Sequence, residues 1–385
     1  MIFYAKYLFT ESYMQLRNRL ISLDILRGFD LFCLLFFQPI LIHWLEILDT
    51  PLLVGLKNQI THVEWHGFSF WDLIMPLFMF MSGITIPFSL SKYKEGKVID
   101  RIFYIKILKR FCRLFVLGWI IQGNLLYFDI SKFCIFSNTL QAIAVGYVIT
   151  AIIYVHTSVV KQIIWGLIFF LSYILVFVCW GDLNFIPTVN IAEEIDRMVL
   201  GRFRDGVIWQ GSNWYFNDSY HYTWILSSLN FVVTVMLGSF AGVILRNKFY
   251  SEMKKFTLLI ILGTLFIIIA LWMDSFIPII KRIWSSSMTL YSGGMCFILM
   301  GLFYYIIDIK KFKWNLNWLK YYGMNSIIAY SIFEVINFHS ISDSLFFGLE
   351  QWMGIYYPLI GTIFQSMIVL LILRWMYKNQ MFVKV

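Results

Sequence analysis

Long apolar stretches alternate with short polar segments along the chain, and this pattern predicts membrane-spanning helices. A transmembrane helix needs about 20 mostly apolar residues. The predicted spans are residues 22–45, 67–90, 103–123, 138–156, 161–181, 222–245, 256–274, 287–308, 320–338 and 357–377. We therefore expect an all-α integral membrane protein, a bundle of about ten transmembrane helices that forms a single domain over residues 1–385.

Basic residues gather in alternate connections between these spans. The clusters are Lys6, Arg17 and Arg19; Lys92, Lys94, Lys97, Arg101, Lys106, Lys109 and Arg110; Lys161; Arg246, Lys248, Lys254 and Lys255; and Lys310, Lys311 and Lys313. The other connections contain fewer, namely Lys57, Arg197, Arg202, Arg204, Lys281 and Arg282. By the positive-inside rule, we expect both termini to be cytoplasmic.

Two long connections fall on the opposite side in this arrangement, residues 46–66 and 182–221. Loops of that length are usually functional or disordered. The second contains several aromatic residues, which argue against disorder: Trp209, Trp214, Tyr215, Phe216 and Tyr220. We expect residues 182–221 to form a folded extracytoplasmic cap. No cleavable signal peptide is evident before the first span.

Composition supports the membrane assignment. Hydrophobic residues make up 60% of the 385 residues and charged residues only 14%, against about a quarter in soluble domains. The net charge of +9 is explained by the clusters that set topology, so no nucleic-acid partner is expected.

Charged residues inside an apolar stretch are costly, and this makes them functional candidates. Asp24 and Arg27 lie one helical turn apart at the start of the first span and can face the same way. They can form an ion pair at the membrane edge, with Arg27 extending to the interface. Alternatively, Arg27 can bind a phosphate or carboxylate of a ligand. The spacing is compatible with both roles.

A histidine and a carboxylate flank the start of the second span. His62 precedes it, and Asp72 lies within it, four residues ahead of Pro76, which we expect to bend the helix. A histidine near a carboxylate can act as a general base, because its unperturbed pKa is close to neutrality. A histidine at a membrane interface can also be structural. His62 and His66 lack an evident further ligand set for a metal ion.

Polar side chains also occur within or beside the fourth and ninth spans: Asn124, Asn138, Gln141, Asn325, Ser326 and Glu334. In an apolar environment such groups need partners. Hydrogen bonds between helices would satisfy them without any ligand. Small residues such as Gly238 and Gly242 are expected to permit close helix packing.

Taken together, these segments resemble the heparan-alpha-glucosaminide N-acetyltransferase family, whose bacterial members belong to a wider group of membrane acyltransferases. Residues 23–28 look like the family's Asp-x-x-Arg-Gly start. Residues 65–76 resemble its Trp-x-Gly and Asp-Leu-x-x-Pro segment. Further segments that look like the family, in the expected order, are residues 196–201, 237–242 and 323–327.

The resemblance implies an acetyltransferase that uses acetyl-CoA as co-substrate and no metal. His62 matches the family's proposed catalytic histidine and would deprotonate the acceptor amine, with Asp72 orienting it; an acetyl-His62 intermediate is also chemically possible. Gln38 stands where the family has an asparagine that faces this histidine. Expected coenzyme-binding residues are Asp24, Arg27, Arg110, Asn124 and Gln141, and expected acceptor-binding residues are Trp65, Asn325, Ser326 and Glu334.

The implied acceptor is a terminal glucosamine or a related amino sugar or oligosaccharide on the face opposite the coenzyme. A homodimer in membrane lipid, in a bacterial inner membrane, is the expected setting. The chain departs from the family at Gln141-Ala142, where an arginine is missing, and at Phe333, where the animal member has a histidine. Two alternatives stay open: an O-acyltransferase of a surface polysaccharide, and a small-molecule transporter lined by Asp24, Arg27, Asp72 and Glu334.

Overall fold

Helices form almost all of the regular structure, as the sequence predicts. The structure is a computed structural model that describes residues 20–48, 50, 53–96, 98–122, 125–126, 128–312 and 316–382. The predictions for the signal-peptide region and for five basic residues lie outside these ranges: Lys6, Arg17, Arg19, Lys97 and Lys313. The predicted coenzyme-binding residue Asn124 also lies outside the described residues.

The elements up to the cap are α2 (Ile21–Phe32), η1 (Cys33–Phe37), α3 (Gln38–Leu48), α4 (Val54–Gln59), η3 (Phe70–Leu73), α5 (Ile74–Lys94), α6 (Arg101–Ile121), η4 (Ile130–Lys132), α7 (Thr139–His156) and α8 (Val159–Trp180). Those that follow are α9 (Ile191–Leu200), η5 (Gly201–Phe203), β1 (Val207–Gln210), β2 (Asn213–Phe216), α10 (Ser227–Arg246), α11 (Glu252–Met273), α12 (Ser286–Phe303), η6 (Tyr304–Ile309), α13 (Asn317–Met324), α14 (Ser326–Val335), α15 (Phe338–Phe346), η7 (Phe347–Leu349), α16 (Glu350–Met353), η8 (Gly354–Tyr356) and α17 (Tyr357–Lys378).

Each of the ten predicted spans corresponds to helical structure, and the polytopic all-α prediction is confirmed. Within the described residues, eight helical stretches are long and apolar enough to cross a membrane. The other two predicted spans are exceptions with different causes. Helix α6 carries five basic residues, and the ninth span is broken into α13 and α14 at Asn325.

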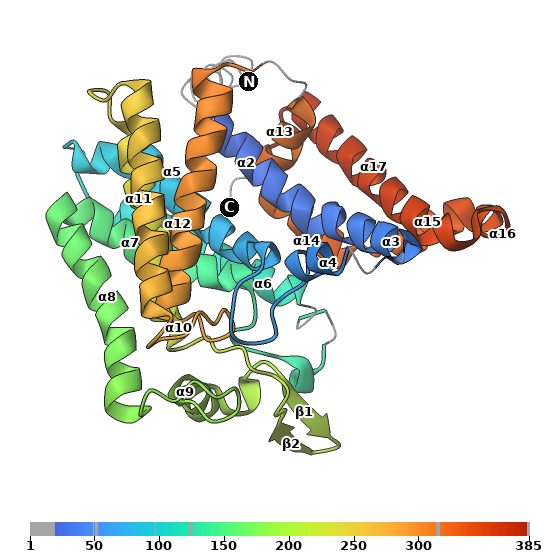
Figure 1. The fold of residues 1–385 in the computed structure, drawn as a ribbon, viewed down its shortest axis with the longest axis horizontal. Coiled ribbons are helices and arrows are strands. Elements are labelled where there is room, and N and C mark those ends of the chain that lie inside the picture. The colour runs from blue at the N-terminus through green and yellow to red at the C-terminus, as the bar shows by residue number, and fades with distance from the viewer. Residues whose placement is uncertain are drawn as a thin grey trace.

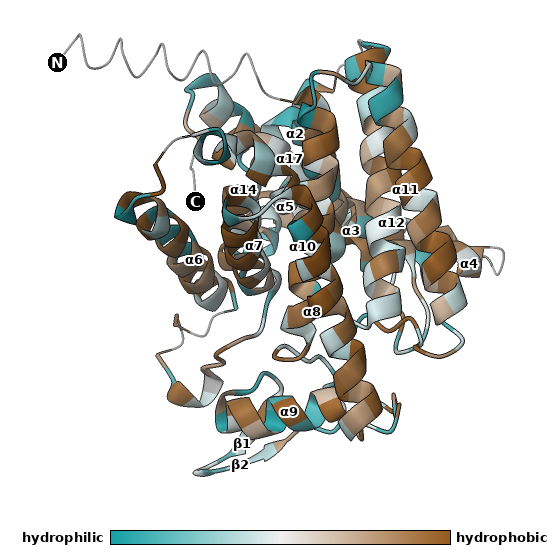
Figure 2. Cartoon of the chain, turned by 90° about the vertical axis from the view of Figure 1, so that its left-hand side faces the viewer, coloured by the Kyte–Doolittle hydropathy of each residue, from teal (hydrophilic) through white to brown (hydrophobic). Residues whose placement is uncertain are grey.

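Helices α5, α7 and α10 form the centre of the bundle. Within their most apolar windows, 67%, 67% and 72% of the residues are buried, against 11% in α8 and 22% in α11. Figure 1 shows α8 at the left edge of the bundle, and Figure 2 shows α11 on the right-hand side; much of the surface of both helices is apolar (Figure 2). This is the arrangement expected when outer helices face lipid.

Close contact between α5 and α10 depends on two glycines. A Cβ atom at Gly83 would lie 2.0 Å from the carbonyl oxygen of Val235, and one at Gly238 would lie 2.0 Å from that of Phe80. No larger side chain fits between these backbones. The prediction that Gly238 permits close packing is confirmed.

The segment 182–221 is folded and forms a cap on one end of the bundle; its extracytoplasmic location stays a prediction. It contains α9, η5 and the antiparallel hairpin β1–β2, which lie together at one end of the bundle (Figure 1). The guanidinium of Arg204 is fully buried and pairs with the carboxylate of Glu193. Asp196 accepts hydrogen bonds from the backbone N–H groups of Trp224 and Ile225 at 2.8 and 2.9 Å. The cap is thereby attached to the start of α10.

The start of the second span differs from the prediction in one respect, the bend expected at Pro76. Helix α5 begins at Ile74, so Pro76 lies in its first turn, where its missing N–H is not needed and no bend is required. Asp72 belongs to the 3₁₀ turn η3, which continues directly into α5. The carboxylate thus lies within the candidate span Phe70–Lys94, near its start, as predicted.

We predict that Gly238→Ala lowers the free energy of unfolding by about 1–3 kcal/mol, because the added methyl group forces α5 and α10 apart. Thermal unfolding of the detergent-purified protein measures this. Gly166→Ala on α8 is the matched control, since its Cβ would meet only the Met236 side chain, at 3.7 Å. Equal melting temperatures for the two variants would contradict the packing argument.

Candidate active site

The carboxylate of Asp72 is the centre of a hydrogen-bonded group at the cap end of the bundle. Its side chain is 1% exposed. Oδ2 accepts hydrogen bonds from the backbone N–H of Ser69 at 3.1 Å, from the Ser69 hydroxyl at 3.0 Å and from the backbone N–H of Val63 at 3.4 Å. The Ser69 and Asp72 side chains form a capping box on η3. Local sequence thus fixes one oxygen of Asp72 and leaves the other to different partners.

His62 forms a hydrogen bond with the second oxygen of Asp72, Oδ1. Its Nδ1 lies 2.8 Å from Oδ1 of Asp72, and the imidazole is 46% exposed. Because an ionised carboxylate only accepts hydrogen bonds, Nδ1 carries a proton in this pair and Nε2 of the neutral ring keeps its lone pair. Nε2 forms no hydrogen bond with the part of the chain that the structure describes. A free imidazole nitrogen held by a carboxylate is the arrangement of a general base.

Lys281 completes the group, and the sequence did not predict it as a site residue. Its Nζ lies 3.2 Å from Oδ1 of Asp72 and 3.1 Å from Nδ1 of His62. Burial lowers the pKa of this lysine, and the Asp72 carboxylate offsets only part of that effect. The available signal was the pair Lys281-Arg282, two basic residues in a connection that topology expects to be poor in them.

Backbone contacts bring Lys281 to the histidine. His66 and Ile280 form an isolated antiparallel bridge, and the N–H of Gly67 donates to the carbonyl of Ile279 at 2.9 Å. Gly67 has φ +117°, a conformation that favours glycine. His66 also pairs with Asp274, Nε2 to Oδ1, at 2.9 Å. The segment after His62 is therefore aligned with the α11–α12 connection.

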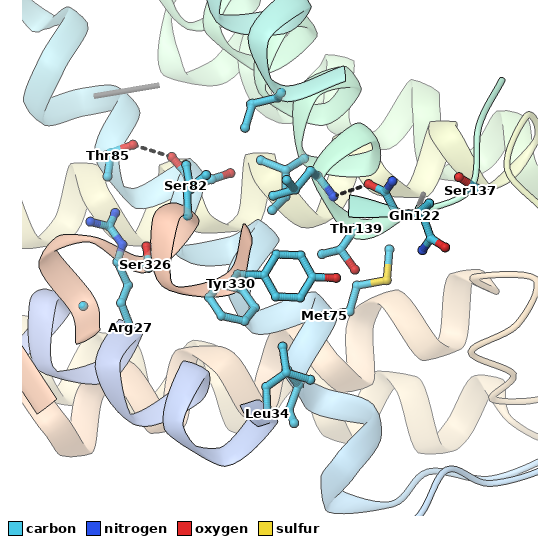
Figure 3. A pocket seen from close by; sticks show the side chains of 18 of the residues that line it. Arg27, Leu34, Met75, Ser82, Thr85, Gln122, Ser137, Thr139, Ser326 and Tyr330 are labelled. Carbon is cyan, nitrogen blue, oxygen red and sulfur yellow. Dashed lines mark hydrogen bonds between the residues drawn. The ribbon is translucent and has the colours of Figure 1, made fainter. Parts of the chain in front are cut away.

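A cavity of about 640 Å³ connects His62 with the opposite end of the bundle. Residues of α5 line it from Ile74 to Ser89, a distance of about 22 Å along the helix axis. In Figure 3, Arg27 lies with Ser82, Thr85 and Ser326 in one part of the cavity, and Gln122, Ser137 and Thr139 lie in another. The cavity therefore crosses most of a hydrocarbon core, which is about 30 Å thick.

The two ends of the cavity differ in chemistry. At the cap end it is lined by His62, Lys281 and the aromatic residues Tyr220, Tyr222 and Trp224. At the other end it is lined by Arg27 and Arg110. The Arg110 guanidinium lies 3.8 Å from the centre of the Tyr147 ring.

A second, smaller cavity of about 310 Å³ adjoins the first at Ser89 and Arg110. Its basic lining residues are Lys92, Lys106, Lys109, Arg110 and Arg113, and no acidic residue lines it among those described. Five cations around one cleft suit a ligand with several phosphates.

Four of the predicted site residues line the main cavity: His62, Arg27, Arg110 and Ser326. Asp72 does not line the cavity and is hydrogen-bonded to His62. Asp24 pairs with Arg27, Oδ1 to Nη1, at 3.7 Å, as the ion-pair interpretation predicts. Ligand binding by Arg27, which also lines the cavity, stays a prediction. Arg27 also donates to the carbonyl of Met81 at 3.3 Å. The first motif therefore places a cation on the cavity and anchors it from α2.

Several other predicted residues do not line the main cavity and make structural contacts. The Gln38 amide donates to the carbonyl of Ile60 at 2.6 Å and holds the segment before His62. Gln141 bonds the backbone of Ile135 and Ser137. The Trp65 indole donates to the carbonyl of Phe185 at 2.8 Å. These three side chains shape the surroundings of the site.

Two predicted residues lie on the interrupted ninth span. Asn325 is buried at the junction of α13 and α14. Glu334 is exposed near the end of α14 and does not line the cavity. Among the described residues, no group of three or more His, Cys, Asp or Glu side chains could hold a metal ion.

Comparisons with known proteins agree with the resemblance seen in the sequence. Residues 19–197 match the model of the heparan-alpha-glucosaminide N-acetyltransferase catalytic region. The mouse (Mus musculus) heparan-alpha-glucosaminide N-acetyltransferase is 26% identical over 71% of this chain and 49% of its own length. The human (Homo sapiens) protein of that name is 30% identical over 40% of this chain and 25% of its own length.

The chain thus spans about half the length of the mouse relative and a quarter of the human one in these matches. The matched catalytic region contains Arg27, His62, Asp72 and Arg110. With the membrane fold and the order of the motifs, these matches support the resemblance of the chain to the heparan-alpha-glucosaminide N-acetyltransferase family.

Proposed function

We propose that this protein is a membrane N-acetyltransferase that moves the acetyl group of acetyl-CoA to the amine of a terminal glucosamine or related amino sugar. The observation that carries the proposal is the single cavity that joins two arginines at one end to the His62–Asp72 pair at the other. Such a cavity lets a donor and an acceptor from opposite faces meet at one base. The curated relatives carry the name of this activity.

The donor fits the basic end of the cavity. Arg27, Arg110 and the cations of the smaller cavity supply charge-assisted hydrogen bonds for the coenzyme phosphates. From there the extended pantetheine arm can follow α5, where Ser82, Thr85 and Ser89 line the wall. Each of these hydroxyls donates to a backbone carbonyl of its own helix and keeps its acceptor capacity for the amides of the arm.

The reaction requires one proton transfer to a base. Nε2 of His62 takes a proton from the acceptor amine, whose nitrogen attacks the thioester carbonyl carbon. The C–N bond forms, the C–S bond breaks, and the His62 imidazolium returns its proton to the sulfur, so that CoA leaves as the thiol and the base is regenerated. Asp72 holds the Nδ1–H tautomer that makes Nε2 available. Gln38 contributes by fixing the segment that precedes His62.

The acceptor fits the cap end. Aromatic rings of Tyr220, Tyr222 and Trp224 line the cavity beside His62 and offer apolar faces on which a sugar ring can pack. The T-shaped contact between Trp65 and His221, with centroids 5.6 Å apart, lies in the same region. A rigid aromatic mouth suits the end of an oligosaccharide.

The distribution of basic residues supports the orientation. Helix α6, the α5–α6 connection and the α10–α11 connection are rich in Lys and Arg, so the basic end of the cavity is assigned to the cytosol and the cap to the opposite face. A bacterial inner membrane and a homodimer belong to the same proposal. In this arrangement acetyl-CoA stays cytosolic and the sugar stays outside.

We predict that His62→Ala lowers acceptor-dependent release of CoA thiol by about a hundredfold to ten-thousandfold, because the general base is lost. Detergent-purified protein with acetyl-CoA and glucosamine is the assay, repeated with the hydroxyl analogue glucose to detect O-acyl transfer. His339→Ala is the control, since that imidazole lies on α15 and does not line the cavity. Full turnover in folded His62→Ala protein would remove His62 from the mechanism.

For the donor site, Arg110→Gln should raise the KM for acetyl-CoA by about tenfold to a hundredfold, because a charge-assisted contact to phosphate is lost. The KM for the acceptor should not change. Arg246→Gln is the matched control: this arginine pairs with Glu95 at 2.7 Å and lines neither cavity. An Arg110 variant with unchanged KM would move the coenzyme elsewhere.

Sidedness can be tested by labelling with a membrane-impermeant maleimide. We expect Asp218→Cys in the cap to be labelled in intact cells above the background of the unaltered chain, because the Asp218 side chain is 82% exposed and the positive-inside rule places it outside. Lys248→Cys, between α10 and α11, should be labelled only after permeabilisation. The reverse pattern would invert the proposed topology.

A further inference from the structure

Lys281 stands beside the His62–Asp72 pair and takes no part in the proton transfer described above. It comes from the α11–α12 connection, outside the region that matches the catalytic family model. Its side chain is 10% exposed, and its Nζ reaches both Oδ1 of Asp72 and the neighbourhood of Nδ1 of His62, at 3.2 and 3.1 Å. Burying the charge of a lysine costs free energy unless the charge is paired, so the position of Lys281 calls for an explanation.

We propose that Lys281 is a positioning residue whose ammonium balances the charge of Asp72, so that His62 remains a neutral base at physiological pH. This inference rests on the proposed function of His62. In this role Lys281 sets the pH range over which the site is active. Lys281 does not contact the reacting atoms.

His62 and Lys281 contact the same oxygen of Asp72, Oδ1. A carboxylate at 2.8 Å favours the charged imidazolium over the neutral ring. An imidazolium has no lone pair and cannot accept the proton of the acceptor amine. An ammonium bonded to the same carboxylate oxygen opposes this effect, since it attracts the carboxylate and repels a second positive charge on the ring.

The position of Lys281 is fixed by its backbone neighbours. Its carbonyl accepts from the N–H of Trp284 at 2.9 Å, and the N–H of Ile280 donates to the Ser285 hydroxyl at 3.1 Å. Ile280 and Ile283 on either side are fully buried. The packed turn therefore fixes the backbone of Lys281 so that its ammonium lies at the Asp72 carboxylate.

The other charged and titratable groups around His62 do not replace this pair. Arg282 faces the Tyr222 ring, 5.6 Å from its centre, and forms no ion pair within the described residues. Burial and the nearby Arg282 lower the pKa of His221, and burial raises the pKa of Tyr222, so both groups are uncharged near neutral pH. His66 is engaged with Asp274. The charges in direct contact with His62 are therefore the Asp72 carboxylate and the Lys281 ammonium.

The test is the pH dependence of His62 modification by diethyl pyrocarbonate, which reacts with neutral imidazole. Rates are measured at His62 by peptide mass spectrometry, from about pH 5 to about pH 9. In Lys281→Met the midpoint should move to higher pH by about one to two units, because the imidazolium gains an uncompensated carboxylate. Lys281→Arg keeps the charge and should leave the midpoint near that of the unaltered protein.

The same variants are then assayed for kcat/KM across this pH range. The acid limb of the Lys281→Met profile should move with the modification midpoint, and activity should recover at high pH. A loss of activity that is equal at every pH, with no shift in the midpoint, would overturn the proposal and indicate contact with the reacting carbonyl. Arg282→Met is the charge-matched control, and a shift as large as that of Lys281→Met would assign the effect to the whole connection and overturn the role of Lys281.

Size-exclusion chromatography and thermal unfolding verify that each variant is folded. If Lys281→Met does not fold, Lys281→Gln replaces it. The modification experiment does not depend on turnover. Absence of N-acetyltransferase activity in the unaltered protein would therefore count against the proposed function, while the midpoint shift would still decide the charge balance at His62.

Discussion

A buried carboxylate must find hydrogen-bond donors and a compensating charge, and this constraint organises the cap end of the molecule. Asp72 draws its partners from three segments: the turn at Ser69, the loop segment at His62 and Val63, and the α11–α12 connection at Lys281. Leaving one partner of a buried pair uncompensated costs about 3–5 kcal/mol. The contacts that satisfy the Asp72 carboxylate thus also align the His62 imidazole. They bring together parts of the chain that are more than 200 residues apart.

The second organising feature is the tight packing of the inner helices, which leaves the cavity on one side of α5. The glycines that join α5 to α10 bury one face of α5 against backbone. A different face, with Ser82, Thr85 and Ser89, stays open to the cavity. One helix therefore contributes both to the rigid core and to the wall of the passage, and the interrupted ninth span, where Ser326 begins α14, contributes to the same wall.

The candidate site is divided between the two parts of the chain. The region that matches the catalytic family model supplies the histidine, its carboxylate and the arginines. Lys281, Ser326 and the aromatic residues Tyr222 and Trp224 come from beyond it. The geometry of the first part is completed by the second, so the catalytic region is best understood as one side of a cavity that closes only when the later helices pack against it.

The membrane class, the positions of the helices and the motifs around Arg27, His62 and Asp72 could be predicted from the amino-acid sequence, because apolar length, charge clusters and short local motifs are properties of neighbouring residues. Only the tertiary structure placed Lys281 at the base and showed that Gln38 and Gln141 bond backbone instead of lining the cavity. Side chains of these types look alike in a sequence. Whether a polar group in a membrane helix faces a ligand or a carbonyl is decided by which helices pack beside it, and that depends on contacts between distant segments.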